Sequence, residues 1–85
     1  MKKEDKITDK LEEFFHNDEF TIFNNSEQHK HHSGYSDGES HFLIEIKSNK
    51  LITKTILEKH KFVFHLLGKE ITNSIHSIEL KFKQI

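Results

Sequence analysis

The chain has 85 residues, a formal net charge of −1 and no cysteine. Its length is that of one small domain. The absence of cysteine excludes a disulfide framework, the usual stabiliser of a small secreted scaffold, and favours a reducing compartment, which we take to be the cytoplasm. No apolar run of signal-peptide or membrane-span length follows the charged N-terminal segment, so no membrane insertion is expected.

The charge balance also disfavours strong nonspecific binding of nucleic acid. The near-neutral total supplies no global positive field for a polyanion. Every basic residue is lysine, so the planar bidentate fork that arginine offers to phosphates or guanine edges is missing.

The first half of the chain predicts a helix, a strand and a long loop. Over residues 5–15, four apolar residues recur at the spacing of one helical face, namely Ile7, Leu11, Phe14 and Phe15. Residues 19–24 are rich in β-forming types and predict a strand. Apolar residues almost vanish over residues 26–40, which predict a loop longer than ordinary connections.

The second half predicts a strand, a helical segment and a last strand. Residues 41–48 alternate apolar with polar types, as expected of a half-buried strand that pairs with the first in an extended hairpin. Residues 53–71 show helical spacing, with Gly68 as a weak point or a stop, and residues 75–83 alternate again. A right-handed crossover then gives an α+β fold with a three-stranded mixed sheet and helices packed on one face.

The histidines divide into a loop cluster and isolated positions. His29, His31 and His32 crowd one segment of the loop, and they are interpreted either as solvated polar residues or as ligands of a metal such as zinc, copper, nickel or iron. A complete zinc finger is not supported, because cysteine and a second ligand pair are missing. Strand parity favours a buried or strand-end role for His76, and His60 lies on the apolar stripe of the helical segment.

Catalytic motifs are absent from the sequence. It contains no nucleophile elbow, no phosphate-binding glycine loop and no GXXG clamp between helices. We therefore expect a protein that is not an enzyme. The lysines of the helical segment are diluted by Glu58 and Glu70, which favours a solvated helix face over a basic stripe.

Four motifs in order make the chain resemble a BolA-like protein from about Lys10 to Phe82. They are Asn25-Ser26 with the His29-x-x-His32-x-Gly34 loop, then Gly38-Glu39-Ser40-His41-Phe42, then Lys59-His60, and finally Ile75-His76-Ser77-Ile78. The sequence departs from the family pattern at Thr53, Lys59 and Ser77, where the family often has glycine, arginine and alanine. Partner or DNA contacts made by that arginine are therefore in doubt.

The resemblance implies a fold, a cargo and a partner. The fold is αββααβ, related to class II KH domains. The role is iron–sulfur cluster trafficking, in which a monothiol glutaredoxin and glutathione supply thiolates to a [2Fe–2S] cluster. The family pattern assigns the remaining ligands to His76 and His32, with His31 or His29 as second choices, and we place His60, Lys59 and His41 toward the partner.

The missing thiolate has consequences for such a site. A chain without cysteine has to hold the cluster at an interface, and imidazole, which protonates near pH 6.5, should make the cluster acid-labile and readily donated. Two alternatives stay open: a DNA-binding transcriptional regulator that uses residues 53–71 with Lys54, Lys59 and Lys61, and a plain zinc or copper binder that uses the loop. A homodimer is compatible with each of them.

Overall fold

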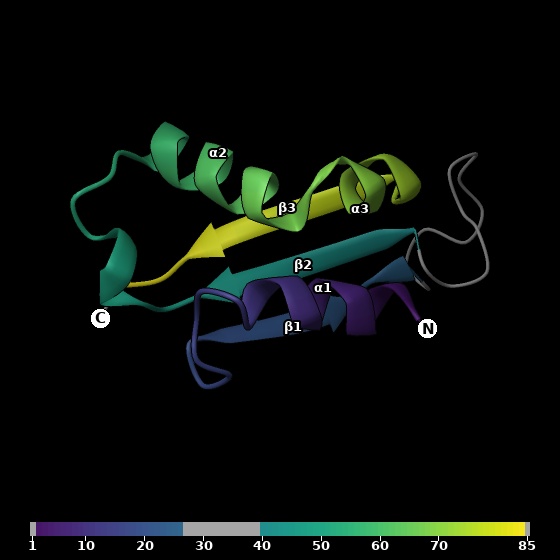
Figure 1. The fold of residues 1–85 in the computed structure, drawn as a ribbon, viewed down its shortest axis with the longest axis horizontal. Coiled ribbons are helices and arrows are strands. Elements are labelled where there is room, and N and C mark those ends of the chain that lie inside the picture. The colour runs from purple at the N-terminus through teal and green to yellow at the C-terminus, as the bar shows by residue number, and fades with distance from the viewer. Residues whose placement is uncertain (1, 27–39, 85) are drawn as a thin grey trace.

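The computed structural model describes residues 2–26 and 40–84. Its helices and strands follow one another along the chain and form two layers (Figure 1). The elements are α1 (Lys3–Leu11), β1 (Phe20–Asn24), β2 (His41–Ile46), the 3-10 turn η2 (Asn49–Leu51), α2 (Ile56–Leu67), α3 (Lys69–Ser74) and β3 (Ser77–Phe82).

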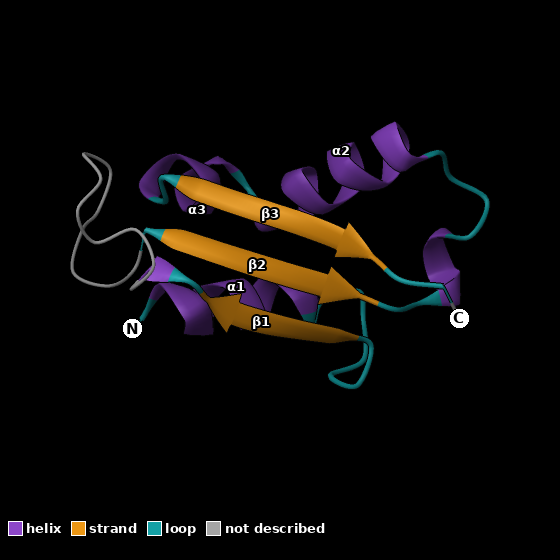
Figure 2. Ribbon diagram, turned by 180° about the vertical axis from the view of Figure 1, so that it is seen from behind, coloured by secondary structure: helices purple, strands orange, loops and turns teal. Residues whose placement is uncertain are grey.

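The three strands form one mixed sheet with β2 in the centre. β1 pairs with β2 antiparallel, and β3 pairs with β2 parallel, with His41 opposite Ser77 and Ile46 opposite Phe82. The helices cover one face, and the other face is open when the molecule is seen from behind (Figure 2). This arrangement confirms the predicted α+β class, the mixed sheet and the antiparallel hairpin.

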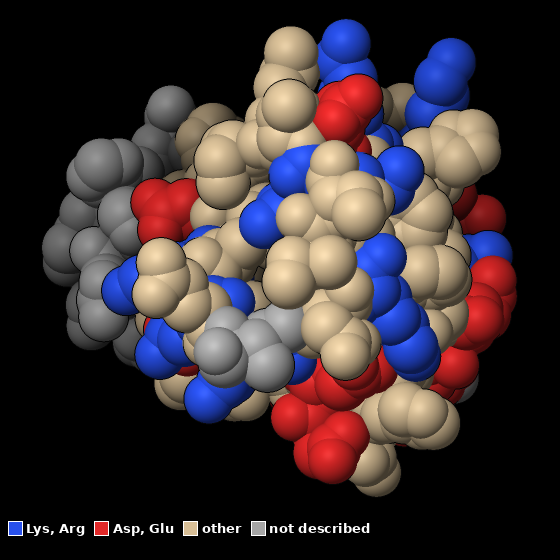
Figure 3. Space-filling model, turned by 90° about the vertical axis from the view of Figure 1, so that its left-hand side faces the viewer, with Lys and Arg blue, Asp and Glu red and all other residues tan. Residues whose placement is uncertain are grey.

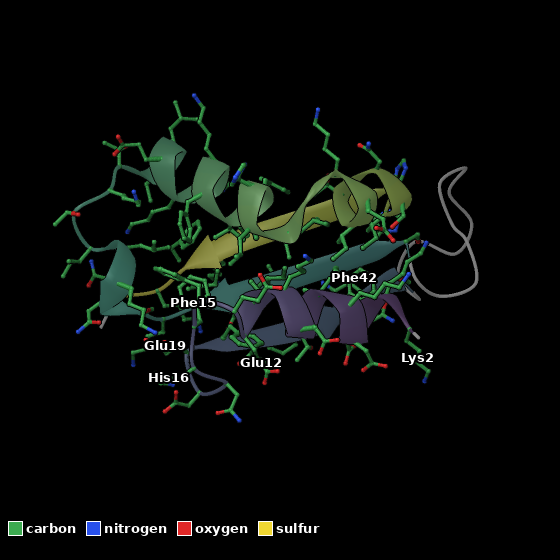
Figure 4. The ribbon with its side chains drawn as sticks, in the orientation of Figure 1. Lys2, Glu12, Phe15, His16, Glu19 and Phe42 are labelled. Carbon is green, nitrogen blue, oxygen red and sulfur yellow. The ribbon has the colours of Figure 1, made fainter. Side chains whose placement is uncertain are left out.

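The core lies between the helices and the covered face of the sheet. Along β2, Phe42, Ile44 and Ile46 are buried, and Leu43 and Glu45 between them are only half-buried. This is the alternation that the sequence predicts for a strand with one covered face. Phe15 and Phe42 lie in this layer (Figure 4). Other buried members are Ile7, Leu11, Leu51, Val63, Leu67, Ile71 and Ile75.

The first helix differs from its predicted bounds of 5–15. It begins at Lys3, where Glu4 and Asp5 occupy the first turn and suit the positive end of the helix dipole. It ends at Leu11, after which the chain tightens, and the Phe14 N–H donates to the Leu11 carbonyl at 3.1 Å. This turn still buries Phe15 together with Ile7 and Leu11. The apolar spacing therefore predicts the buried residues correctly, although the helix is shorter.

The predicted helical segment over 53–71 is two helices that begin later and end later. Thr55 caps α2 in a capping box with Glu58, so the chain before it is a turn rather than helix. Gly68 separates α2 from α3 with a φ of +87°, a conformation that side-chain-bearing residues rarely adopt. Gly68 is therefore a stop, and α3 continues to Ser74 beyond the predicted end.

The strands are slightly shorter than predicted. β1 begins at residue 20 rather than 19, β2 ends at residue 46 rather than 48, and β3 spans residues 77–82 rather than 75–83. Ile75 is buried in the turn before β3, and His76 follows it and is exposed. Of the two roles that parity favoured for His76, burial is wrong and a position at the strand end is right. No helix within the described ranges is long and apolar enough to cross a membrane.

Candidate functional site

Two histidines meet where β2 and β3 begin. His41 is the first residue of β2, and His76 immediately precedes β3. Because these strands run parallel, their first residues lie at the same end of the sheet. The ring centres of His41 and His76 are 5.0 Å apart with an angle of 58° between the ring planes. The fold therefore joins two imidazoles that are far apart in sequence.

The two histidines differ in exposure. His76 stands in solvent, whereas only 8% of His41 is exposed. The His41 Nδ1 atom lies 2.7 Å from the Ser40 hydroxyl, a hydrogen bond that orients the ring. The Ser77 N–H donates to the Ser40 carbonyl at 2.9 Å and ties the two strand starts together. His76 is thus the accessible imidazole, and His41 is the fixed one beside it.

Ser26 holds this end of the sheet together. Its hydroxyl accepts hydrogen bonds from the Ser40 N–H at 2.9 Å and the His41 N–H at 3.1 Å, and it lies 3.4 Å from the His41 carbonyl. Ser26 and Ser40 are only 1% and 2% exposed. They stand on either side of residues 27–39 in the sequence. We call Ser26, Ser40, His41 and His76 the histidine end.

A small cavity of about 90 Å³ adjoins the histidine end. Its lining comes from β2, β3 and the residue after β1, and consists of Asn25, His41, Phe42, Ser77 and Glu79. Within residues 2–26 and 40–84, no three side chains of the metal-binding types converge on one point. The accessible donor of this end is the His76 imidazole, a ligand type that suits borderline metals such as iron.

Comparison with known proteins agrees with this fold. The family model described as "BolA-like protein" matches residues 11–84. The chain belongs to the BolA-like family. Its sequence is 31% identical over 84 residues to "UV-induced protein uvi31" of Schizosaccharomyces pombe, covering 94% of this chain and 82% of that protein.

Solved BolA structures share the fold along nearly the whole chain. BolA1 from Arabidopsis thaliana superposes with a TM-score of 0.78 at 25% identity, covering 99% of this chain and 93% of that one. The BolA domain of SufE1 from the same plant superposes with a TM-score of 0.73 at 29% identity, covering 93% and 87%. The match spans only 51% of the full BOLA1 protein and 22% of the full SufE-like protein 1.

The loop histidines of this BolA-like chain lie outside the described residues. His29, His31 and His32 all fall within residues 27–39, so their predicted roles as ligands stay predictions.

His60 and Lys59 of helix α2, with Lys54 in the turn before it, lie toward the other end of the sheet. The His60 Nδ1 atom is 2.9 Å from the Ile56 carbonyl, and its ring meets Phe82 edge-on at 5.2 Å. The Lys59 ammonium lies 5.7 Å from the centre of the Phe82 ring, and Lys54 is 5.6 Å from that of Phe62. These contacts agree with a packing role for His60, and its predicted contact with a partner stays a prediction.

Two carboxylates have lowered pKa values, and neither belongs to the histidine end. Hydrogen bonds from the His16 N–H and the Ser48 hydroxyl, with the Lys50 ammonium, lower the pKa of Glu19 from 4.5 to about 2. A hydrogen bond from the Thr55 N–H also lowers the pKa of Glu58. Their role is structural, since each holds a turn or a helix start.

The sequence did not reveal the contact between His41 and His76 or the role of Ser26. His41 was placed only by its family motif, and Ser26 only by its position after the first strand. A signal for Ser26 exists in hindsight, because a serine that follows a strand directly and precedes a polar loop is well placed to hydrogen-bond backbone groups. The partner groups of that serine became visible only in the folded chain.

Proposed function

We propose that this chain is a non-enzymatic adaptor that shares a [2Fe–2S] cargo with a monothiol glutaredoxin. The observation that carries the proposal is the exposed His76, which stands at an end of the sheet whose backbone is held by buried hydrogen bonds. Membership of the BolA-like family supports it. A further support is SufE1 of Arabidopsis thaliana, in which a BolA domain with the same fold forms one part of a longer protein.

The residues at this end suit a cluster site shared with a second protein better than a site formed by this chain alone. His76 supplies one neutral nitrogen donor, and the chain holds no thiolate. Iron–sulfur clusters are held mainly by cysteine thiolates, so the glutaredoxin and its glutathione would have to supply them. We assign the second imidazole from this chain to His32, with His31 and His29 as substitutes, as the family pattern implies.

His41 has a supporting role in this proposal. Its ring lies against His76 and is fixed through the Ser40 hydroxyl. Neighbours of a ligand that fix its orientation influence affinity strongly. His41 therefore positions His76 rather than contacting the glutaredoxin over a broad surface, since 8% of it is exposed.

Coexpression with a monothiol glutaredoxin tests the proposal directly. The purified complex should show visible circular dichroism that differs from that of the glutaredoxin cluster alone, and His76→Ala should abolish the difference. His16→Ala is the matched control, because His16 is an exposed histidine at the opposite end of the sheet (Figure 4). An unchanged spectrum in His76→Ala would overturn the ligand assignment. Calorimetric titration of the two apo proteins separates loss of cluster from loss of complex.

The loop position is tested by three single variants, His29→Ala, His31→Ala and His32→Ala. We expect His32→Ala to reproduce the His76→Ala spectrum and the other two to leave it close to wild type. A purified lone chain that holds stoichiometric zinc or copper would instead favour the metal-binder alternative. The alternative of DNA binding through Lys54, Lys59 and Lys61 involves the other end of the sheet, so these histidine variants do not test it.

A further inference from the structure

A second candidate surface lies at the end of the sheet opposite the paired histidines. It is formed by η2 with its following turn, by the start of α2 and by the end of β3 (Figure 1). Ile52 is 69% exposed there, Ile56 60% and Leu57 63%. Aliphatic side chains exposed as a group, rather than singly, mark interaction sites.

A groove of about 450 Å³ joins these elements. Ile52, Ile56 and Phe82 supply its apolar lining, and Lys59 and Lys83 bring positive charge to it. Ser48 and Gln84 complete the lining, so no acidic side chain lines the groove. We call Ile52, Ile56, Leu57, Lys59, Phe82 and Lys83 the lysine end.

Positive charge is concentrated at this end although the whole chain is close to neutral. Residues 47–61 contain five lysines and one acidic residue, and residues 81–84 contain two lysines and no acidic residue. Glu58, the acid within these two ranges, uses its carboxylate to accept a hydrogen bond from the Thr55 N–H at 2.8 Å. Two acids from other segments also reach this end, where Glu19 pairs with Lys50 and Glu45 pairs with Lys83, each at 3.1 Å. Figure 3 views this end and shows lysine side chains set among uncharged ones, with acidic side chains toward the edges of the view.

We infer that the lysine end binds an acidic segment of a second protein, one that carries apolar side chains among its Asp and Glu residues. The apolar side chains would bury Ile52, Ile56 and Leu57. The carboxylates would face Lys59 and would share Lys83 with Glu45, its partner within the chain at 3.1 Å. Such a pairing combines desolvation of apolar surface with complementary charge at the rim, which is the ordinary anatomy of a protein interface.

Other occupants fit these features less well. A nucleic acid would set its phosphates against three exposed aliphatic side chains, which contribute nothing to phosphate binding. A second copy related by a two-fold axis would bring identical lysines together. An interfacial membrane helix presents a continuous apolar face to lipid, whereas α2 buries Val63 and Leu67 in the core.

The position of the lysine end permits two partners at once. β2 and β3 run from the histidine end to the lysine end, so a protein bound at one end leaves the other accessible (Figure 2). The same chain then has a surface for a second protein, whether or not a cluster is bound at the histidines.

The test uses a labelled peptide and the full chain. The probe has about twelve residues, with leucine at helical spacing and aspartate or glutamate elsewhere. Its binding is followed by fluorescence anisotropy and by amide chemical shifts of the isotope-labelled protein. We expect shifts confined to residues 48–61 and 81–84, and affinity that falls as salt screens the charges. Absence of shifts at about millimolar peptide would overturn the inference, millimolar being the weakest affinity of interest.

Variants separate the contribution of the exposed aliphatic side chains from that of the lysine charge. Ile52→Ser with Leu57→Ser should weaken peptide binding roughly tenfold, since each exposed aliphatic group loses part of its burial energy. Lys59→Gln should weaken it about threefold and flatten the salt dependence. Phe23→Ser and Lys10→Gln are the controls, because Phe23 is exposed on β1 and Lys10 pairs with Glu13 on α1. Equal losses in the controls would overturn the assigned surface.

Competitors decide between occupants. Duplex DNA and vesicles of anionic phospholipid are titrated under the same conditions as the peptide. If either one binds at least as tightly as the peptide and depends on the same side chains, the acidic-segment inference is wrong and that occupant replaces it. If both bind more weakly than the peptide and tolerate Ile52→Ser with Leu57→Ser, the inference is supported.

Discussion

At the end where β2 and β3 begin, the buried Ser26 hydroxyl is hydrogen-bonded to backbone groups and the buried Ser40 hydroxyl to the His41 ring. The exposed His76 stands beside them. At the end where the same strands finish, aliphatic side chains and lysines face solvent around an open groove. The first end is neutral and closed by hydrogen bonds, and the second is charged and apolar. The comparison indicates that one small sheet presents two surfaces for two different kinds of contact.

The largest stability effect is expected at the histidine end. Ser26→Ala removes the acceptor of the Ser40 and His41 N–H groups and leaves both donors buried without it. An unsatisfied buried donor costs about 1–3 kcal/mol, so we expect the free energy of unfolding to fall by roughly 2–3 kcal/mol. Urea denaturation at neutral pH measures it.

Ser74→Ala is the control for Ser26→Ala. The Ser74 hydroxyl donates a single hydrogen bond, to the Ile71 carbonyl at 2.9 Å, and its loss should cost only about 0.5–1 kcal/mol. Equal losses for the two serines would contradict the central role given to Ser26 and would weaken the contrast between the two ends.

The next effect concerns Glu19, whose partners reach toward the lysine end. Its pKa of about 2 lies below the ordinary 4.5, so the folded state is stabilised above pH 4.5 and loses this contribution as the pH falls toward 2. Glu19 is partly exposed, and screening reduces the contribution to about 1–2 kcal/mol. Glu19→Gln should remove most of this stability contribution at pH 7. It should also reduce the fall in the free energy of unfolding between pH 4.5 and pH 2.

Thermal unfolding between pH 2 and 7 checks the Glu19 prediction. Wild type and Glu19→Gln should approach one another at low pH, where the carboxylate of the wild type is protonated. Glu12→Gln is the control, because Glu12 is exposed on the surface (Figure 4). Curves for Glu19→Gln and wild type that stay parallel down to pH 2 would show that hydrogen bonding rather than charge supplies the stability.

A smaller effect is expected at the start of α2. Thr55→Ala removes the hydroxyl that accepts from the Glu58 N–H at 3.2 Å, and loss of such a cap costs about 1 kcal/mol. Because α2 positions Ile56 and Leu57, the same variant should loosen the lysine end and leave the histidine end unchanged. Amide hydrogen exchange, read residue by residue, distinguishes this local loss from global destabilisation.

Local patterns in the sequence predicted the elements of the fold better than their ends. The alternation around Ile44 identified the central strand and its buried face, because a strand with one covered face repeats every two residues. The same patterns did not show where helices stop. The sequence is compatible with Gly68 as a weak point or as a stop, and the positive φ of Gly68 in the folded chain shows that it is a stop.

The site was predictable only in part. The family motif singled out His76, but its exposure depends on Ile75 taking the last core position before β3. The contact of His76 with His41 joins residues that are 35 positions apart, and it arises from parallel strand pairing that no local pattern encodes. The sequence pattern favours a solvated helix face for the lysines of residues 53–71. Residues 47–52 and 81–84 come beside these lysines only in the folded chain, so no local pattern predicts the lysine end.

The smallest stability effect is expected from the aliphatic side chains of the lysine end. Ile52→Ser and Leu57→Ser remove side chains that already stand in solvent, so the free energy of unfolding should change by less than about 0.5 kcal/mol. Leu51→Ala, next to Ile52 but only 2% exposed, should cost about 2–4 kcal/mol in the same urea titration. A substantial loss from Ile52→Ser would mean that this side chain supports the fold. If stability is unchanged and acidic-peptide binding is lost, these aliphatic groups serve a partner rather than the core, and the two ends differ in purpose as well as in chemistry.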